Sequence, residues 1–180
     1  MWSPRQATTR RDAGFTLIEL IVVVGTIGVV AAIAIPSLVR AKIATNETAT
    51  LGSMRAVNSA QAAYAVAAAP GAYATSFGVL TQSCPGSSQG FISPDLAGDP
   101  AKKSGYFMAL GPGSLGPGQT DCNGTATSLG YYLTATPITT NLTGSRGFAS
   151  TSPGVVYFTA TGLPPTEAEM APGGGATPIQ

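Results

Sequence analysis

The chain has 180 residues, of which only 9% are charged, and its formal net charge is +1. It contains no histidine, which excludes a Ser–His–Asp triad, a Cys–His pair and any histidine-ligated metal site. No stripe of basic residues is present either. We therefore predict that the protein is not an enzyme and has no nucleic-acid partner.

The first feature along the chain is a short basic leader, residues 1–14, followed by an apolar run. The leader carries four charged residues: Arg5, Arg10, Arg11 and Asp12. The run over residues 15–35 has one ionisable side chain, Glu19. As a helix this run spans about 31 Å, close to the roughly 30 Å hydrocarbon thickness of a bilayer. We predict a transmembrane helix over residues 15–35, with the net positive leader on the cytoplasmic side.

A carboxylate inside an apolar run needs a partner, because a charge held in the membrane costs roughly 2.5–3.5 kcal/mol. If the chain is cut between Gly14 and Phe15, the new α-amine lies about one helical turn from Glu19. The amine can then pair with this carboxylate or with that of a neighbouring copy. The alternative is that Glu19 is tolerated near the membrane surface and reaches outward to water.

The stretch RRDAGFTLIELIVVVGTIGVVAAIAIPSLVRAK resembles the N-terminus of type IV pilins and of the pseudopilins of type II secretion. The resemblance implies cleavage by a prepilin peptidase between Gly14 and Phe15, and N-methylation of Phe15. It also implies assembly into a helical filament, in which Glu19 and Thr16 serve subunit assembly. Pro36 matches the position near the end of the apolar run where such helices kink.

The same resemblance implies the partners and the location of the protein. The partners are other copies of the chain, related minor pilins, the prepilin peptidase, the inner-membrane assembly platform and the lipid bilayer. The chain would cross the bacterial inner membrane once, with its N-terminus cytoplasmic and its head periplasmic, before joining a periplasmic or surface filament. Three roles stay open: a pseudopilin in protein secretion, a major pilin of a surface fibre, or a minor pilin. A membrane-tethered periplasmic binding domain that does not polymerise is an alternative of another class.

An ordinary secretory signal is a rival interpretation of the apolar run. Residues 32–34, Ala-Ile-Ala, have the small-x-small pattern of a signal-peptidase site, and cleavage there would release a soluble protein beginning at Ile35. The length of the run and the acid at Glu19 are unusual for a signal core. They favour the membrane helix.

Residues 36–69 are predicted to continue the helix as an amphipathic segment, which Pro70 and Gly71 end. Pro36 should bend or locally unwind the helix without ending it. A stripe at three- and four-residue spacing indicates a face packed on a sheet; its members are Ile43, Leu51, Met54, Val57, Gln61 and Tyr64. Four other residues are expected mostly off this stripe: Asn46, Glu47, Thr50 and Arg55.

Residues 70–163 are predicted to form a globular head, and residues 164–180 a mobile tail. The head begins with a connection rich in proline and glycine that contains one helical turn near residues 77–81. Three strands are expected at residues 105–110, 130–136 and 154–160, and a short fourth is left open around 146–148. The predicted fold is α+β and pilin-like: a long N-terminal helix, membrane-spanning in its first half, packed on a small antiparallel sheet of three or four strands. The strand sequences also resemble the meander of pseudopilin-like pilins.

Two groups of residues in the head are candidates for cross-linking or metal binding. Cys84 and Cys122 form an even pair in an oxidising compartment, so we predict a disulfide, which closes a ring of about 39 residues and contributes roughly 4 kcal/mol. Two separate thiols are the alternative. Asp95, Asp99 and Asp121 could supply oxygen ligands for calcium. Because Asp95 and Asp99 adjoin prolines and are ordinary turn residues, we expect no cofactor.

Overall fold

The structure is a computed structural model that describes residues 14–179. The leader residues Arg5, Arg10, Arg11 and Asp12, for which cytoplasmic placement was predicted, lie outside the described residues. The chain divides into two units with the boundary between Leu38 and Val39. The elements in chain order are α1 (Leu17–Ala67), α2 (Phe77–Thr81), a 3₁₀ turn (Pro94–Leu96), β1 (Ala101–Lys103), β2 (Tyr106–Pro112), β3 (Tyr131–Pro137), β4 (Gly147–Thr151), β5 (Val156–Thr159), α3 (Glu167–Met170) and β6 (Thr177–Ile179).

The first unit contains the N-terminal part of α1, which is apolar on every side. Its sequence is rich in valine and isoleucine, which are only moderate helix formers in water. In an apolar environment a helix is favoured because it satisfies every backbone polar group internally. The two hydroxyl groups of this segment follow the same rule: Thr26 Oγ1 donates to the Val23 carbonyl and Ser37 Oγ to the Ala34 carbonyl, each at 2.8 Å. Pro36 lies inside α1 and does not end it.

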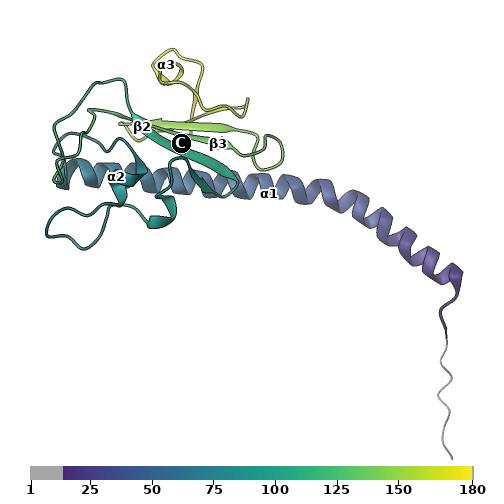
Figure 1. Ribbon diagram of the computed structural model, residues 1–180. Helices are drawn as coiled ribbons and strands as arrows, with labels where there is room; N and C mark the ends of the chain where they lie inside the picture. Colours follow the sequence, from purple (N-terminus) through teal and green to yellow (C-terminus); the bar gives the residue numbers. More distant parts are fainter. Residues whose placement is uncertain (1–13, 180) are drawn as a thin grey trace, which may run out of the picture. The chain divides into compact units, whose positions relative to one another are not determined.

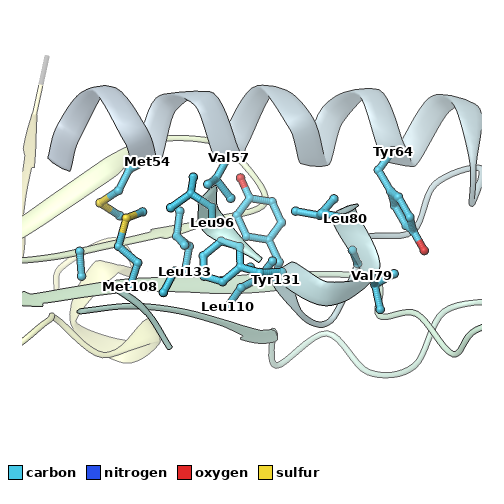
Figure 2. Packing of buried hydrophobic residues seen from close by; sticks show 14 of the residues in the cluster. Met54, Val57, Tyr64, Val79, Leu80, Leu96, Met108, Leu110, Tyr131 and Leu133 are labelled. Carbon is cyan, nitrogen blue, oxygen red and sulfur yellow. The ribbon is translucent and has the colours of Figure 1, made fainter. Parts of the chain in front are cut away.

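In the second unit, one face of α1 packs on the sheet, as the stripe predicted. Met54, Val57 and Tyr64 of α1 are buried against side chains of β2, β3 and α2 (Figure 2). The stripe is wider than predicted, because Glu47 and Thr50 are also buried. Both were expected mostly off it, and this expectation was wrong.

The sheet is an antiparallel meander of six strands in the order β1-β2-β3-β4-β5-β6. The α+β fold, with its long helix packed on an antiparallel sheet, is therefore confirmed. The predicted count of three or four strands is too low because β1 and β6 were missed. Each of them has three residues, β1 within the proline-rich connection and β6 within the segment predicted as a mobile tail. That segment also forms α3.

The two faces of the sheet have different coverings. Along β3 the side chains alternate, so that Leu133 is buried on the α1 face while Tyr132 lies on the other. The hydroxyl of Tyr132 donates to the Pro165 carbonyl at 2.8 Å, just before α3. Thr166 and Glu169 form a capping box that begins α3. Within the second unit, α3 thus lies over the sheet face turned away from α1 (Figure 1).

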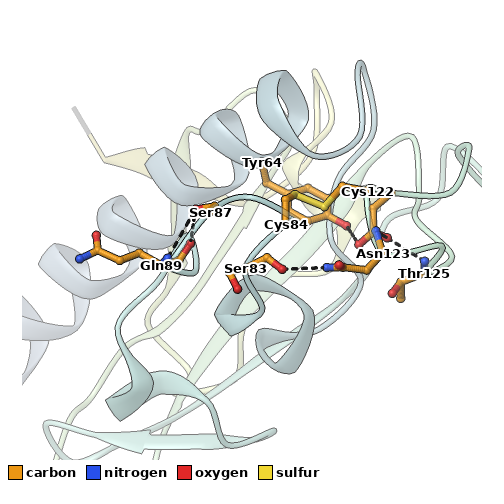
Figure 3. The surroundings of a disulfide bond; sticks show 9 residues. Tyr64, Ser83, Cys84, Ser87, Gln89, Cys122, Asn123 and Thr125 are labelled. Atoms are coloured by element: carbon orange, nitrogen blue, oxygen red, sulfur yellow. Dashed lines mark hydrogen bonds between the residues drawn. A yellow bond between two sulfur atoms is a disulfide. The ribbon is translucent and has the colours of Figure 1, made fainter.

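The predicted disulfide between Cys84 and Cys122 is present and joins the loop after α2 to the loop between β2 and β3 (Figure 3). Beside it, the Asp121 carboxylate is buried and accepts a hydrogen bond from the Tyr64 hydroxyl of α1 at 2.7 Å. The other carboxylate oxygen accepts the backbone N–H groups of Asn123 and Thr125. The end of α1 and the disulfide are therefore connected through Asp121.

Candidate processing and assembly segment

The first turn of α1 is built from Thr16 and Glu19. The backbone N–H of Glu19 donates to Thr16 Oγ1 at 3.2 Å, so that Thr16 caps the helix that begins at Leu17. Glu19 is the third helical residue, where a carboxylate is stabilised by the positive end of the helix dipole. Thr16 and Glu19 have the Thr-x-x-Glu spacing of a capping box, a signal that the sequence analysis did not use. Both residues therefore have a local structural role as well as the predicted one in assembly.

The predicted cleavage site lies just before this cap. Gly14 and Phe15 are in irregular structure, and the Phe15 side chain is 84% exposed. A side chain added at Gly14 would meet no atom within 4 Å. The bond between the two residues is therefore accessible in the described chain, which is what a peptidase requires. Cleavage and methylation stay predictions.

The large apolar side chains of residues 15–38 are all exposed. Their exposed fractions run from 47% at Val23 to 84% at Phe15. By length and composition α1 is able to cross a membrane, a test that a signal sequence near the N-terminus also passes. Contiguous apolar surface of this extent marks contact with a membrane or with another protein.

The predicted site residues lie close together because they are neighbours in the sequence, and the fold does not bring them together from distant parts of the chain. Gly14, Phe15, Thr16 and Glu19 lie together because they are consecutive or nearly so, and Pro36 lies further along the same helix. Among the hydrogen bonds described for residues 14–38, the one that involves Glu19 lies within its own helical turn. The segment is thus an exposed apolar surface, with one acid and one cap at its beginning.

The aspartates considered for calcium are not assembled into a site. Asp95 pairs with Lys103, and Asp121 accepts its hydrogen bonds beside the disulfide. Within residues 14–179, no three Asp, Glu or Cys side chains converge in a way that would hold a metal ion.

An ion pair in the second unit, between the buried Glu47 and the exposed Arg146, was missed by the sequence analysis. Glu47 Oε2 pairs with Arg146 Nε at 3.2 Å, and Glu47 Oε1 accepts the hydroxyl and the N–H of Ser145 at 2.9 Å each. These contacts fix α1 to the loop between β3 and β4. The spacing 47, 50, 54, 57, 61 and 64 was readable in the sequence, but Glu47 and Thr50 were expected mostly off the stripe.

Residues 9–35 match the family model described as the prokaryotic N-terminal methylation motif. This motif is the signature of type IV pilins and pseudopilins, so the resemblance inferred from the sequence is confirmed over these residues. No curated protein and no solved structure matches the chain.

Proposed function

We propose that this chain is a structural subunit of a pilin-like filament, made as a membrane-anchored precursor and cut between Gly14 and Phe15. The observation that carries the proposal is the methylation motif at residues 9–35, which leads into the part of α1, up to Leu38, whose large apolar side chains are all exposed. The role is that of a structural part, with no chemistry of its own.

Assembly exchanges one apolar environment for another. Before assembly, residues 15–35 contact lipid, and in the filament they contact the same segment of other copies. Burial against protein is hardly better than burial against lipid, so packing fit and polar contacts must supply direction and register. Glu19 is the one ionisable group available in this segment for that purpose.

Cleavage creates the partner that Glu19 requires. The new α-amine of Phe15 carries a positive charge close to the N-terminus of α1, where the helix dipole is itself positive. An anion is needed to offset both, and Glu19 lies in the first turn. Pairing with the amine of a neighbouring copy would neutralise the two charges only when the subunits have the correct stagger.

Within this class we propose a type II secretion pseudopilin or a related type IV pilin-like protein, located in the inner membrane before assembly. The meander sheet supports the pseudopilin, as does the position of the disulfide. Cys84–Cys122 closes the connecting loop and the first two strands, and does not staple the C-terminal end of the chain. A major or minor pilin of a surface fibre is the second form of the same proposal.

The variant Glu19→Ala tests the proposal. We expect processing to Phe15 to continue, as measured by mass spectrometry of the N-terminus, while incorporation into sheared or crosslinked filaments is lost. Glu19→Gln should behave in the same way because the charge is what matters, whereas Glu19→Asp should retain part of the yield.

Two results would contradict the proposal. One is a normal filament yield from Glu19→Ala; the other is an assembly whose subunits keep residues 1–14 or begin at a residue other than Phe15. Val23→Cys gives a third measurement: oxidation of this variant should produce crosslinked copies, whereas a tethered binding domain that does not polymerise would stay monomeric.

A further inference from the structure

The strands of the second unit run alongside α1, so one end of the sheet lies near the beginning of this stretch of α1 and the other lies further along it (Figure 1). At the first end, Asn46 Nδ2 donates to the Thr143 carbonyl at 2.8 Å, in the loop between β3 and β4. At the far end, Asn58 Nδ2 donates to the Gly154 carbonyl at 2.9 Å, in the turn between β4 and β5. We call the first the entry end; it comprises residues 39–47 of α1 and the loops at residues 138–146 and 160–165.

Two exposed leucines lie on neighbouring loops at the entry end. Leu142 is in the loop between β3 and β4 and is 53% exposed, and Leu163 follows β5 and is 67% exposed. The two loops adjoin, because a side chain added at Gly162 would come within 3.1 Å of Thr140 Cγ2. Neither leucine belongs to the cluster that packs between α1 and the sheet. The entry end therefore presents apolar surface that the second unit leaves uncovered.

Two cations accompany the leucines at the entry end. Arg40 and Lys42 lie on α1 at the beginning of the second unit, and both are exposed. They take part in neither of the two ion pairs found within residues 14–179. Glu47, the next acid along α1, is buried and pairs with Arg146. The charges of Arg40 and Lys42 are therefore available to a partner outside the chain.

The other charges near the entry end offset one another. Asp95 pairs with Lys103 at the edge of the sheet. Asp99 and Lys102 are both exposed and carry opposite charges three positions apart. The remaining charged residues of the second unit lie further along α1 or at the far end of the sheet; they are Arg55, Asp121, Glu167 and Glu169. The excess charge of the entry end is thus positive and comes from α1.

The positions of Arg40 and Lys42 in the chain suit a membrane surface. The apolar run ends at Ile35, and the two cations follow it after about 7 to 11 Å of helix. The headgroup layer on each side of a bilayer is about 5–8 Å thick. Both side chains therefore reach this layer when residues 15–35 lie in the hydrocarbon, as the proposed function requires.

The leucines reach the same layer when the second unit tilts. Leu142 is next to Thr143, which is bonded to Asn46, about 16 Å of helix beyond Ile35. Membrane helices are tilted by about 20° on average. A tilt toward the sheet lowers the loops, because the sheet lies to one side of α1. Pro36, between the apolar run and the second unit, is a position at which a helix bends.

We propose that the entry end rests on the surface of an anionic phospholipid bilayer before assembly, with Arg40 and Lys42 on lipid phosphates and the two leucines in the headgroup layer. The inference rests on the proposed membrane-anchored precursor and gives it a second contact with lipid. Basic residues beside a membrane helix attract anionic headgroups, and apolar side chains enter the boundary between headgroups and acyl chains.

A bilayer meets all four side chains because they lie next to the segment that it already holds. The contact belongs to the subunit before assembly and is broken when the subunit leaves the membrane. It therefore makes no demand on how the heads pack in a filament with residues 15–35 at its core.

The accessibility of a fluorescent label in bilayers tests the contact. The label is attached to full-length Leu142→Cys, whose two native cysteines are held in the disulfide. We expect acrylamide to quench it roughly twofold less in nanodiscs of phosphatidylglycerol and phosphatidylethanolamine than in detergent. Leu129→Cys is the matched control, because Leu129 is 47% exposed and leads into β3 at the far end of the sheet. Its quenching should be the same in both.

Charge variants identify the lipid contribution. Arg40→Gln combined with Lys42→Gln should restore quenching of the Leu142→Cys label, because each cation near an anionic surface is worth roughly fivefold in binding. Nanodiscs of phosphatidylcholine, which carry no net charge, should have the same effect on the parent label. Arg55→Gln is the matched control on the same helix and should leave the label shielded.

The outcomes separate this inference from the proposed function. If the Leu142→Cys label is quenched equally in anionic nanodiscs and in detergent, the lipid contact is overturned, while loss of filaments in Glu19→Ala would still support the filament subunit. Shielding that appears only when several copies share a nanodisc also overturns it and assigns the leucines to contact between copies. Shielding in a chain that forms no filaments would keep the lipid contact and contradict the proposed function. If Leu142→Cys does not fold, Leu163→Cys carries the label, with the same results expected.

Discussion

Residues 17–38 and 39–67 belong to one α-helix but differ in whether their large apolar side chains are covered by the chain. In the first stretch the large apolar side chains are all exposed, whereas in the second Met54 and Val57 are fully buried. The local structure is the same, so helix propensity does not distinguish them. The difference is whether the rest of the chain supplies a covering surface.

The polar groups of the two stretches differ in the same sense. In the first, side-chain hydroxyls bond only to their own helix. In the second, Gln61 exchanges two hydrogen bonds with the backbone of Ala74, at 2.8 and 2.9 Å, and Asn58 donates to Ser150 and to the Gly154 carbonyl. The second stretch is therefore held in place by contacts within the chain, whereas the first requires contact with lipid or with another copy. Variants in the first should alter processing and assembly, and variants in the second should alter stability.

The largest effect is expected at Gly14. We expect Gly14→Val to abolish processing, because the resemblance implies a peptidase that needs a small residue there, while the thermal unfolding of the second unit is unchanged. Immunoblots of precursor and mature forms measure the first, and circular dichroism in detergent the second. Gly25→Val is the control, since both glycines have open space around them and only Gly14 adjoins the cut. Efficient cleavage of Gly14→Val would refute the prediction.

The second effect belongs to the disulfide. Replacing both Cys84 and Cys122 by serine should lower the free energy of unfolding by roughly 4 kcal/mol, because the ring no longer constrains the unfolded chain. Denaturant unfolding in detergent measures this loss, and cleavage at Gly14 should stay normal. If the double variant is as stable as the parent but is not processed, the division between the two stretches is wrong.

The smallest effect concerns Tyr64 and pH. Burial raises the pKa of Asp121, but hydrogen bonds from Tyr64, Thr125 and Asn123 lower it further, so that the net shift is downward. The carboxylate therefore adds stability that is fully present above its pKa in the unfolded chain, about 4. This stability is lost as the pH falls through the lower pKa of the folded state. Tyr64→Phe should cost about 1.5–3 kcal/mol at neutral pH, the range for a hydrogen bond to a charged group.

The pH dependence distinguishes this hydrogen bond from packing. The difference in stability between the parent and Tyr64→Phe should shrink as the pH falls through the lowered pKa of Asp121, because protonation removes the charged acceptor of the hydrogen bond. Tyr73→Phe is a control, since no hydrogen bond from the Tyr73 hydroxyl is found within residues 14–179. A difference that stays constant with pH would assign the loss to packing.

Much of the fold could be predicted because its signals are local. The turn at Phe77–Thr81 is α2, and β2, β3 and β5 fall at three predicted strands. Each of these strands begins one or two residues after a glycine and is rich in aromatic or β-branched residues. The fourth strand, left open around 146–148, is β4 at Gly147–Thr151.

The missed features have weak signals in their own residues. β1 has two lysines and β6 has a proline, so neither resembles a strand until its neighbour is placed beside it. The burial of Glu47 depends on Arg146, which is 99 positions away. The pocket lined by Ser114, Thr151 and Glu167 likewise joins three separate segments. The methylation motif at residues 9–35 was predictable because its residues are adjacent in the chain.

The order of the strands has a consequence for how the protein acquires its structure. Every ladder of the sheet joins consecutive strands, so the meander can grow one hairpin at a time with little loop-closure entropy. The polar contacts that Glu47 and Asn58 of the covering helix make span 73 to 99 positions. We expect the hairpins to form early and the docking of α1 to complete folding, with Glu47, Asn58 and Gln61 setting the final register.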